Sequence, residues 1–363
     1  MNHRRAVRLA GAAIACATLL PLAGCASNDA TAGNDSTASG GGAATGVLPG
    51  EPDVNGDGKV VIGVLSPGDI NDNGYYQSFV DGADAFAKSK GWTVIKRGSV
   101  PVSEALSAAR ALCQQKVDMV ALGASELKDA IPASEEAVCA KTAWYVPTSG
   151  NIQQTPRIML STDKADQSIL TAGYAAGVMM KERGATKAAF VTGMEADFTL
   201  AAARAFKAGV RSVVPNATVT TTYAGDQNDA AKAKEAVQAQ MDQGAQVVYP
   251  YLGGSTDAAT ALANTKKLIT LTPGTDRCSS TSPKFDISVL FSPGDYFTEA
   301  LKQFADGKLA MGVEKVWTIG KDPYPTVKFC DGNAERQKQV AAYMQDIASG
   351  KIDAAAEVKR LGG

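Results

Sequence analysis

The stretch that decides the fold runs from Lys59 to Arg97 and reads KVVIGVLSPGDINDNGYYQSFVDGADAFAKSKGWTVIKR. It begins with a short run rich in β-branched residues, which is typical of a buried strand. An amphipathic segment with helical spacing follows and ends at Gly91, a residue type that commonly closes helices. A second strand-like run, WTVIKR, comes directly after it. This order predicts two parallel strands joined by a covering helix.

The same alternation continues along most of the chain. Further strands are predicted at 117–123, 142–148, 187–193, 217–225, 245–253, 268–274 and 283–292. Helices are predicted at 102–116, 126–141, 164–184, 198–214, 229–244, 255–266, 293–307 and 334–350. Pro132 should interrupt one of these helices. Short apolar strands between helices indicate parallel sheets covered on both faces, and the chain is long enough to need two such lobes.

The N-terminus is typical of an export signal. Basic residues precede an apolar run that ends in Leu22-Ala23-Gly24-Cys25. This tetrad resembles a bacterial lipobox, which implies cleavage before Cys25 and acylation of its thiol, with palmitate as one of the chains. An ordinary signal with a chance cysteine is the alternative, and the pair Arg4-Arg5 leaves Sec and twin-arginine export both open. We expect a signal peptide at 1–24 and a protein anchored on the extracellular face of the cell membrane.

Residues 25–57 contain almost no large apolar side chains, so they cannot offset the entropy of ordering and should form a flexible tether. The segment DVNGDG at its end imitates the start of a calcium loop. The position that should supply a bidentate carboxylate is Val64, however, so we expect a turn and no metal.

Charge and composition exclude several classes of function. The formal net charge is −1, and removal of the leader takes three basic residues and no acid, which leaves 33 basic against 37 acidic residues and a net charge of −4. No basic patch suggests nucleic acid. The single histidine, His3, lies in the leader, which removes histidine-based catalysis and metal binding.

Motifs of catalysis are equally scarce. The patterns Ser125-x-x-Lys128 and Ser161-x-x-Lys164 lack the companion elements of serine acylation. No phosphate-binding glycine loop occurs. We therefore expect a binding protein without cofactor or enzymatic activity.

Four cysteines remain after the leader and Cys25, an even number that predicts two disulfides in an exported protein. Order along the chain favours Cys113–Cys139 and Cys278–Cys330, although three pairings are possible. No CxxC occurs, which argues against a zinc or redox role.

Two adjacent rings, Tyr75 and Tyr76, follow the first strand, at the edge where open α/β sheets bind ligands. An aromatic face holds a planar heterocycle with about 1 kcal/mol beyond the burial of area. Neighbouring residues on a helix face different directions. We therefore expect one ring in the cleft and the other in the core, the alternative being that both pack the helix onto its sheet.

Two similar α/β lobes tethered outside a membrane describe a periplasmic-type binding protein with a cleft between the lobes. The chain resembles the basic membrane protein family, the nucleoside-binding lipoproteins of ABC importers. Asp72 and Gln77 match the family's first loop, and Tyr75 stands where its phenylalanine stacks on the base. The segment VVYPYLGGST falls on a glycine-rich strand exit, which implies that Tyr251 and Gly253 lie at the ligand. Asp276, in LTPGTDRC, corresponds to the acid at the ribose hydroxyls.

Three departures from the family's pattern leave the ligand open. Ser66 replaces the acid after the first strand, Gln227 or a neighbour replaces an aromatic residue, and a lysine after Ser292 is missing. The resemblance implies these ligand-binding residues: Ser66, Asp72, Tyr75, Tyr76, Gln77, Tyr251, Gly253 and Asp276.

The resemblance also implies a type I periplasmic-binding-protein fold with two Rossmann-like lobes. The N-terminal lobe is expected at 58–160 with a return segment at about 277–312. The C-terminal lobe is expected at 161–276 with a final segment at about 313–363. A monomer would pass a nucleoside-like ligand to permease and ATPase subunits, with a sugar-binding or ligand-sensing lipoprotein of the same fold as the alternative.

Overall fold

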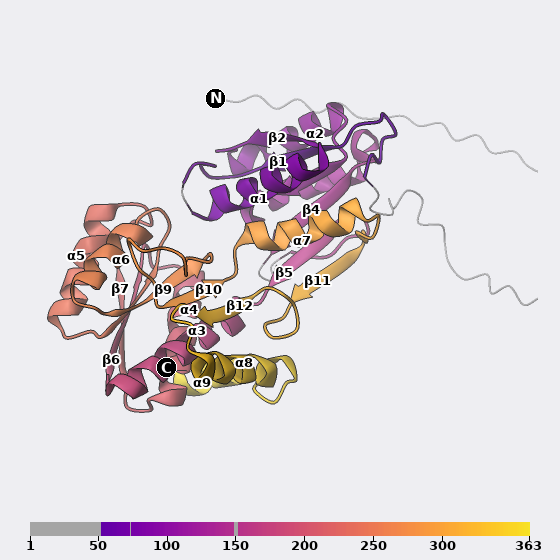
Figure 1. The fold of residues 1–363 in the computed structure, drawn as a ribbon. Coiled ribbons are helices and arrows are strands. Elements are labelled where there is room, and N and C mark those ends of the chain that lie inside the picture. The colour runs from indigo at the N-terminus through magenta and orange to yellow at the C-terminus, as the bar shows by residue number, and fades with distance from the viewer. Residues whose placement is uncertain (1–51, 73, 149–151) are drawn as a thin grey trace, which may run out of the picture. The chain divides into compact units, whose positions relative to one another are not determined.

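The computed structural model describes residues 52–72, 74–148 and 152–363. These residues form two six-stranded sheets with helices packed on both faces of each (Figure 1). The leader, Cys25 and nearly all of the expected tether lie outside the described residues. In the described part, no helix is long and apolar enough to cross a membrane. The expected α/β class with two helix-covered sheets is confirmed.

The first sheet has the strand order β11-β5-β4-β3-β1-β2, and every neighbouring pair is parallel. Its strands are β1 (Val61–Leu65), β2 (Thr93–Arg97), β3 (Met119–Leu122), β4 (Ala143–Thr148), β5 (Met159–Asp163) and β11 (Val313–Trp317). All residues of β3 and β4 are buried. This burial explains their continuous apolar runs, because the central strands of a parallel sheet are covered on both faces.

Side chains of the first sheet alternate between two helical layers, as the pleat of a strand requires. Ile62 packs on one face with α1 (Tyr75–Lys90) and α7 (Pro293–Ala305). Leu65 packs on the other face. That face is covered by α2 (Ala105–Gln114) and by the 3-10 segments η1 (Val102–Glu104), η2 (Ser125–Glu135) and η3 (Ala137–Cys139).

The second sheet has the order β12-β10-β9-β8-β6-β7, with β12 antiparallel to β10 and all other pairs parallel. Its strands are β6 (Lys187–Thr192), β7 (Thr218–Tyr223), β8 (Val247–Tyr251), β9 (Ile269–Gly274), β10 (Ile287–Leu290) and β12 (Thr326–Phe329). Phe190 of β6 lies in one core, and its neighbours Ala189 and Val191 lie in another.

The helices of the second sheet follow this division. The core around Phe190 is covered by α3 (Ala165–Arg183), α4 (Asp197–Val213), α8 (Ala334–Ala348) and α9 (Ala354–Leu361). The opposite core is covered by α5 (Ala230–Asp242) and α6 (Thr256–Thr265).

The sequence missed four elements: β5, β11, β12 and α9. β11 and β12 lie at the edges of their sheets and are only partly buried, so they lack the continuous apolar run of a central strand. The segment around Pro132 is a 3-10 helix with a kink at Leu127, which replaces the interrupted α-helix that was expected.

The strand pairing also differs from the expected division of the chain. Position 160 falls inside β5, so the first sheet continues to Asp163. β10 lies within the expected return segment 277–312 but pairs with β9 in the second sheet, whereas β11 pairs with β5 in the first. A strand of four buried residues fits either sheet, so only the long-range pairing decides to which sheet β10 belongs.

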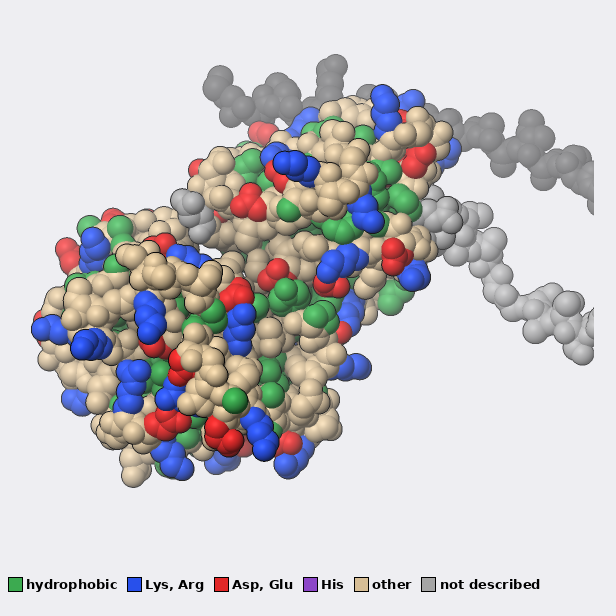
Figure 2. Space-filling model, viewed as in Figure 1, with side chains coloured by type: hydrophobic (Ala, Val, Ile, Leu, Met, Phe, Trp, Pro, Cys, Tyr) green, Lys and Arg blue, Asp and Glu red, His purple; other side chains and the backbone are tan. Residues whose placement is uncertain are grey.

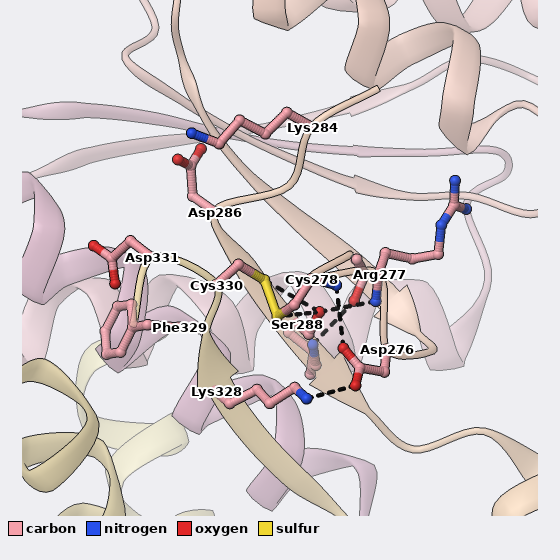
Figure 3. Close-up of a disulfide and its surroundings, with 12 residues drawn as sticks. Asp276, Arg277, Cys278, Lys284, Asp286, Ser288, Lys328, Phe329, Cys330 and Asp331 are labelled. Carbon is pink, nitrogen blue, oxygen red and sulfur yellow. Dashed lines mark hydrogen bonds and ion pairs between the residues drawn. A yellow bond between two sulfur atoms is a disulfide. The ribbon is translucent and has the colours of Figure 1, made fainter. Parts of the chain in front are cut away.

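Both expected disulfides are confirmed. Cys113 of α2 bonds Cys139 of η3, with a Cα–Cα distance of 5.1 Å. Cys278, after β9, bonds Cys330, after β12, at 4.7 Å (Figure 3). The turn predicted from DVNGDG is also confirmed, because the Asp53 carboxylate accepts hydrogen bonds from the backbone N–H groups of Asp57 and Gly58.

Replacing Cys113 and Cys139 together by alanine should lower the free energy of unfolding by about 2–4 kcal/mol, because the bond restricts the unfolded chain over a separation of 26 residues. Urea-induced unfolding of the double variant measures this change. As a control, thiol titration of the denatured, unreduced parent should detect neither cysteine. An unchanged unfolding midpoint in the double variant would contradict the prediction.

Candidate ligand-binding site

Loops from the two sheets meet at the carboxyl ends of their strands. A Cβ atom placed on Gly254, after β8, would lie 3.0 Å from the carbonyl oxygen of Asp72, after β1. In open α/β sheets this is the edge where ligands bind. A surface hollow lined in part by Arg183, Gln238 and Lys267 lies at the amino ends of β8 and β9, away from the converging loops. We therefore place the candidate site at the carboxyl edge of the sheets and not in that hollow.

The two adjacent tyrosines have different surroundings. The ring of Tyr76 covers Gly68, where an added Cβ would lie 2.2 Å from a ring carbon. Tyr75 keeps 46% of its surface exposed and meets the Tyr76 ring edge-on, with centroids 5.5 Å apart. Tyr76 therefore packs on the loop, and Tyr75 is the ring available to a ligand.

The pKa of the Tyr75 hydroxyl reflects the groups around it. Burial raises the pKa of its hydroxyl, and Tyr145 and Asp163 raise it further. Burial, with smaller contributions from Glu126 and Asp72, likewise raises the pKa of Tyr76 to about 12.

Two of the expected site residues, Asp72 and Ser66, hold the loop between β1 and α1, and a third, Gln77, lies in α1 itself. The Asp72 carboxylate accepts hydrogen bonds from the backbone N–H groups of Gly74 (2.8 Å) and Gln77 (3.0 Å), which satisfies donors at the start of α1. Ser66 is fully buried, and its hydroxyl bonds the backbone of Gly68. The Gln77 amide donates to Asp81.

Tyr251 ends β8 and is packed between two other rings. Its centroid lies 5.3 Å from that of Phe190 and 6.1 Å from that of Phe291, both nearly parallel to it. Burial raises the pKa of Tyr251, and the Asp163 carboxylate adds to the shift.

Gly253 begins the loop after β8. Its N–H donates to the carbonyl of Gln227 at 3.0 Å. A Cβ at this position would lie 2.6 Å from Oδ1 of Asn228, so a larger residue would displace the Asn228 side chain, which accepts a hydrogen bond from the N–H of Gly254. The contact with Asn228 accounts for the glycine at position 253. The hydrogen bond from Gly253 holds Gln227 near the candidate site.

Asp276 lies in a different environment (Figure 3). Its Oδ2 accepts a hydrogen bond from Nζ of Lys328 at 2.5 Å, and its Oδ1 accepts one from the N–H of Cys278 at 3.1 Å. Partial burial acts to raise the pKa of Asp276, but the Lys328 ammonium and the Cys278 N–H outweigh it and hold the pKa below its ordinary value. Among the described residues, none of the contacts of Asp276 involves Tyr75 or Tyr251.

Sequence reasoning missed a carboxylate whose charge acts on these tyrosines. Asp163 is the last residue of β5, and its Oδ1 accepts a hydrogen bond from the hydroxyl of Tyr296 at 3.1 Å. Burial raises the pKa of Asp163 to about 7, against the opposing effect of the Tyr296 hydrogen bond. Its charge acts on the hydroxyls of Tyr75, Tyr145 and Tyr251. The polar run STD after the apolar run IML could have indicated a strand end here.

A second layer of hydrogen bonds fixes the side chains around Asp163. Ser161 accepts hydrogen bonds from the Tyr145 hydroxyl (2.9 Å) and from Nε1 of Trp317 (2.8 Å). Tyr296 stacks on Trp317, with centroids 5.1 Å apart. The serine of the second Ser-x-x-Lys pattern is thus a buried structural hydroxyl.

Two helix-covered sheets whose strand ends converge are the architecture of the type I periplasmic-binding-protein fold, as expected. The family model described as "ABC transporter substrate-binding protein PnrA-like" matches residues 59–344. The chain therefore belongs to this family, Bmp, of ABC transporter substrate-binding proteins.

Individual relatives are distant. The chain is 28% identical over 254 residues to the ABC transporter nucleoside-binding protein BmpA of Lactococcus lactis subsp. cremoris (strain MG1363), covering 68% of this chain and 65% of that protein. A solved solute-binding protein of an ABC transporter system from Conexibacter woesei DSM 14684 superimposes with a TM-score of 0.65 at 20% identity, covering 81% of this chain and 98% of that one. GanP, a glucose-galactose binding protein from Geobacillus stearothermophilus, gives 0.53 at 16% identity, covering 76% and 99%.

Asp163 should make stability depend on pH. Its pKa is about 7 in the folded chain and about 3.9 when unfolded, so the folded chain binds more protons between these values. The free energy of unfolding should therefore fall as pH rises from about 4 to 7. The groups acting on Asp163 include Tyr75 of α1, Tyr296 of α7 and Asp166 of α3, with Tyr145 of β4 and Tyr251 of β8.

Asp163→Asn should remove this dependence, because the amide does not ionise. The variant should be more stable than the parent by roughly 2–4 kcal/mol at pH 8 and equally stable near pH 4. Urea-induced unfolding at the two pH values measures the difference. A difference between the variant and the parent that does not change with pH would show that Asp163 ionises normally.

Proposed function

We propose that the protein captures a nucleoside, or a similar small heterocycle, and delivers it to an ABC importer without catalysing a reaction. The observation that carries this proposal is the half-exposed ring of Tyr75, which lies near Asp163 at the edge where loops of both sheets meet. Membership of the Bmp family supports the delivery role, and the description of BmpA as nucleoside-binding supports the ligand class.

The physical basis is a combination of stacking and hydrogen bonding. The face of Tyr75 supplies a stacking surface for a planar base. Tyr251 and Gly253 form the opposing surface from the second sheet. Asp276 accepts hydrogen bonds from sugar hydroxyls in this proposal, which requires the ligand to share that carboxylate with Lys328. Ser66, Asp72, Tyr76 and Gln77 shape the first loop around the ligand.

The location and partners also belong to the proposal. Acylation of Cys25 anchors the protein on the extracellular face of the cell membrane, where it passes its ligand to a permease that is driven by an ATPase subunit. Acidic and basic side chains are interspersed over the face drawn in Figure 2. That mixture suits a monomer that binds a small molecule and no nucleic acid.

A sugar ligand is the second candidate. The protein described as binding glucose and galactose shares the fold, and this chain has Ser66 and Gln227 at positions where the nucleoside-binding pattern has an acid and an aromatic residue. A sensor that signals to a membrane receptor would use the same site.

Calorimetric titration of the purified mature protein decides between these ligands. A panel of purine and pyrimidine nucleosides, free bases and free pentoses and hexoses should show binding by nucleosides and none by free sugars at similar concentrations. Tight binding of a free sugar, with no gain from a base, would overturn the nucleoside proposal in favour of the sugar-binding alternative.

Tyr75→Ala should weaken binding of the preferred nucleoside about 5- to 30-fold, because the stacking face is lost. Tyr75→Phe should be nearly neutral, since the ring remains. Both affinities are measured by calorimetry, with thermal unfolding to confirm that the variants fold. Equal losses in the two variants would assign the effect to the hydroxyl group and exclude stacking as its source.

Cys25→Ser should move the protein from the membrane fraction to the medium or periplasm, because the acylated thiol is lost. Fractionation of cells that express the variant and the parent provides the measurement. If the variant remains in the membrane fraction, Cys25 is not the anchor.

A further inference from the structure

The connection between β6 and α4 presents two large apolar side chains to solvent. It comprises residues 193–196, and α4 begins at Asp197. Met194 keeps 50% of its surface exposed and Phe198 keeps 55%, the highest exposed fraction among the large apolar side chains that the structure describes. A single exposed apolar side chain needs no explanation, whereas a group of them at a functional edge indicates a binding surface.

Hydrogen bonds within this connection fix its shape. The hydroxyl of Thr199, a fully buried residue, accepts the N–H of Ala196 at 2.9 Å and donates to the carbonyl of Met194 at 2.8 Å. The backbone on either side of Met194 and Phe198 is therefore held by a buried side chain. The two apolar side chains are presented to solvent from a fixed frame, which lowers the entropy that binding there would cost.

The connection leaves the second sheet beside the loop that we assign to the ligand. Thr192 ends β6 and pairs in register with Tyr251, which ends β8. A Cβ atom on Gly193 would lie 2.7 Å from the backbone nitrogen of Gln227. The carbonyl of Gln227 in turn accepts the N–H of Gly253 at 3.0 Å. The exits of β6, β7 and β8 thus pack on one another at the carboxyl edge.

A planar base has two faces, and Tyr75 can cover only one of them. Tyr251 offers no free ring face for the other, because it is packed between Phe190 and Phe291, at centroid distances of 5.3 and 6.1 Å. Phe198 is an aromatic ring at the same edge of the second sheet and has more than half of its surface free.

We infer that Phe198, together with Met194 of the same connection, forms the second apolar wall of the ligand site and stacks on the face of the heterocycle opposite Tyr75. This inference rests on the proposed function and narrows its ligand class to purines. Enclosure between two rings favours purines over pyrimidines, because the larger ring system buries more apolar area on both faces.

Three variants test the wall. Phe198→Ala removes the ring, and Phe198→Tyr retains it. Because Phe198 is exposed, both variants should fold like the parent, which thermal unfolding checks. Val313→Ala is the matched control, since Val313 keeps 48% of its surface exposed but begins β11, at the amino edge of the first sheet.

Calorimetry of the purified mature protein with adenosine and uridine measures the effect. The parent should bind adenosine more tightly than uridine. Phe198→Ala should weaken adenosine about 5- to 30-fold and uridine less, because one stacking face is lost. Phe198→Tyr and Val313→Ala should keep the affinities of the parent.

A spectroscopic measurement tests direct contact with the ligand. In Phe198→Trp, saturating adenosine should quench the added indole emission and shift it to shorter wavelength, because the exposed ring becomes enclosed. The parent, titrated in the same way, provides the baseline for its own three tryptophans. An emission from the added indole that adenosine leaves unchanged would overturn the inference.

The binding outcomes separate this inference from the proposed function. If nucleosides bind but uridine binds as tightly as adenosine, or Phe198→Ala keeps the affinities of the parent, the inference fails and the proposed function stands. A loss of uptake by cells in a variant with unchanged affinity would then assign Phe198 to a permease contact.

A sugar ligand gives a different result. Binding of glucose in place of nucleosides would overturn the nucleoside proposal. A loss of glucose affinity of about 5-fold or more in Phe198→Ala would then keep Phe198 as a wall of the site, whereas unchanged glucose binding would overturn both proposals.

Discussion

The chain passes from β5 to α3 with only Lys164 between the two elements, and the arrangement of the site depends on this short connection. β5 belongs to the first sheet and α3 covers the second, so the carboxyl end of β5 has to lie where the two meet. The chain returns between β10 and α7 through Phe291 and Ser292. Asp163 and Phe291 stand directly at these crossings, and Tyr296 follows in the first turn of α7.

The pKa values of two carboxylates near this region are shifted in opposite directions by their surroundings. Asp276 has a lysine partner and stays ionised well below neutral pH. Asp163 has only hydroxyl and backbone donors, and burial brings its pKa to about 7. Opposite shifts of this kind arise because a neighbouring cation favours the charged form while desolvation opposes it.

The rigid elements around the site explain how a partly buried charge is tolerated. Ser161 joins Tyr145 and Trp317, and Trp317 stacks on Tyr296, so the donor to Asp163 is fixed by a connected set of contacts. Loops supply the remaining surfaces, and each is fastened locally. Asp72 caps the start of α1, and the disulfide Cys278–Cys330 ties the loop that carries Asp276 to β12. Preorganisation of this type lowers the entropy that binding costs.

The sequence by itself determined the features that depend on local pattern. Alternating strands and helices established two helix-covered sheets, the cysteine count and order indicated both disulfides, and the segment after β1 identified the two tyrosines. Only the tertiary structure decided that Tyr76 covers Gly68 while Tyr75 remains exposed, that β10 and β11 belong to different sheets from those expected, and that Asp163 lies among tyrosines from both sheets. The reason is physical: periodicity records which side of an element is buried, whereas the partner of a strand end or of a carboxylate is set by residues a hundred or more positions away, such as Tyr296 for Asp163.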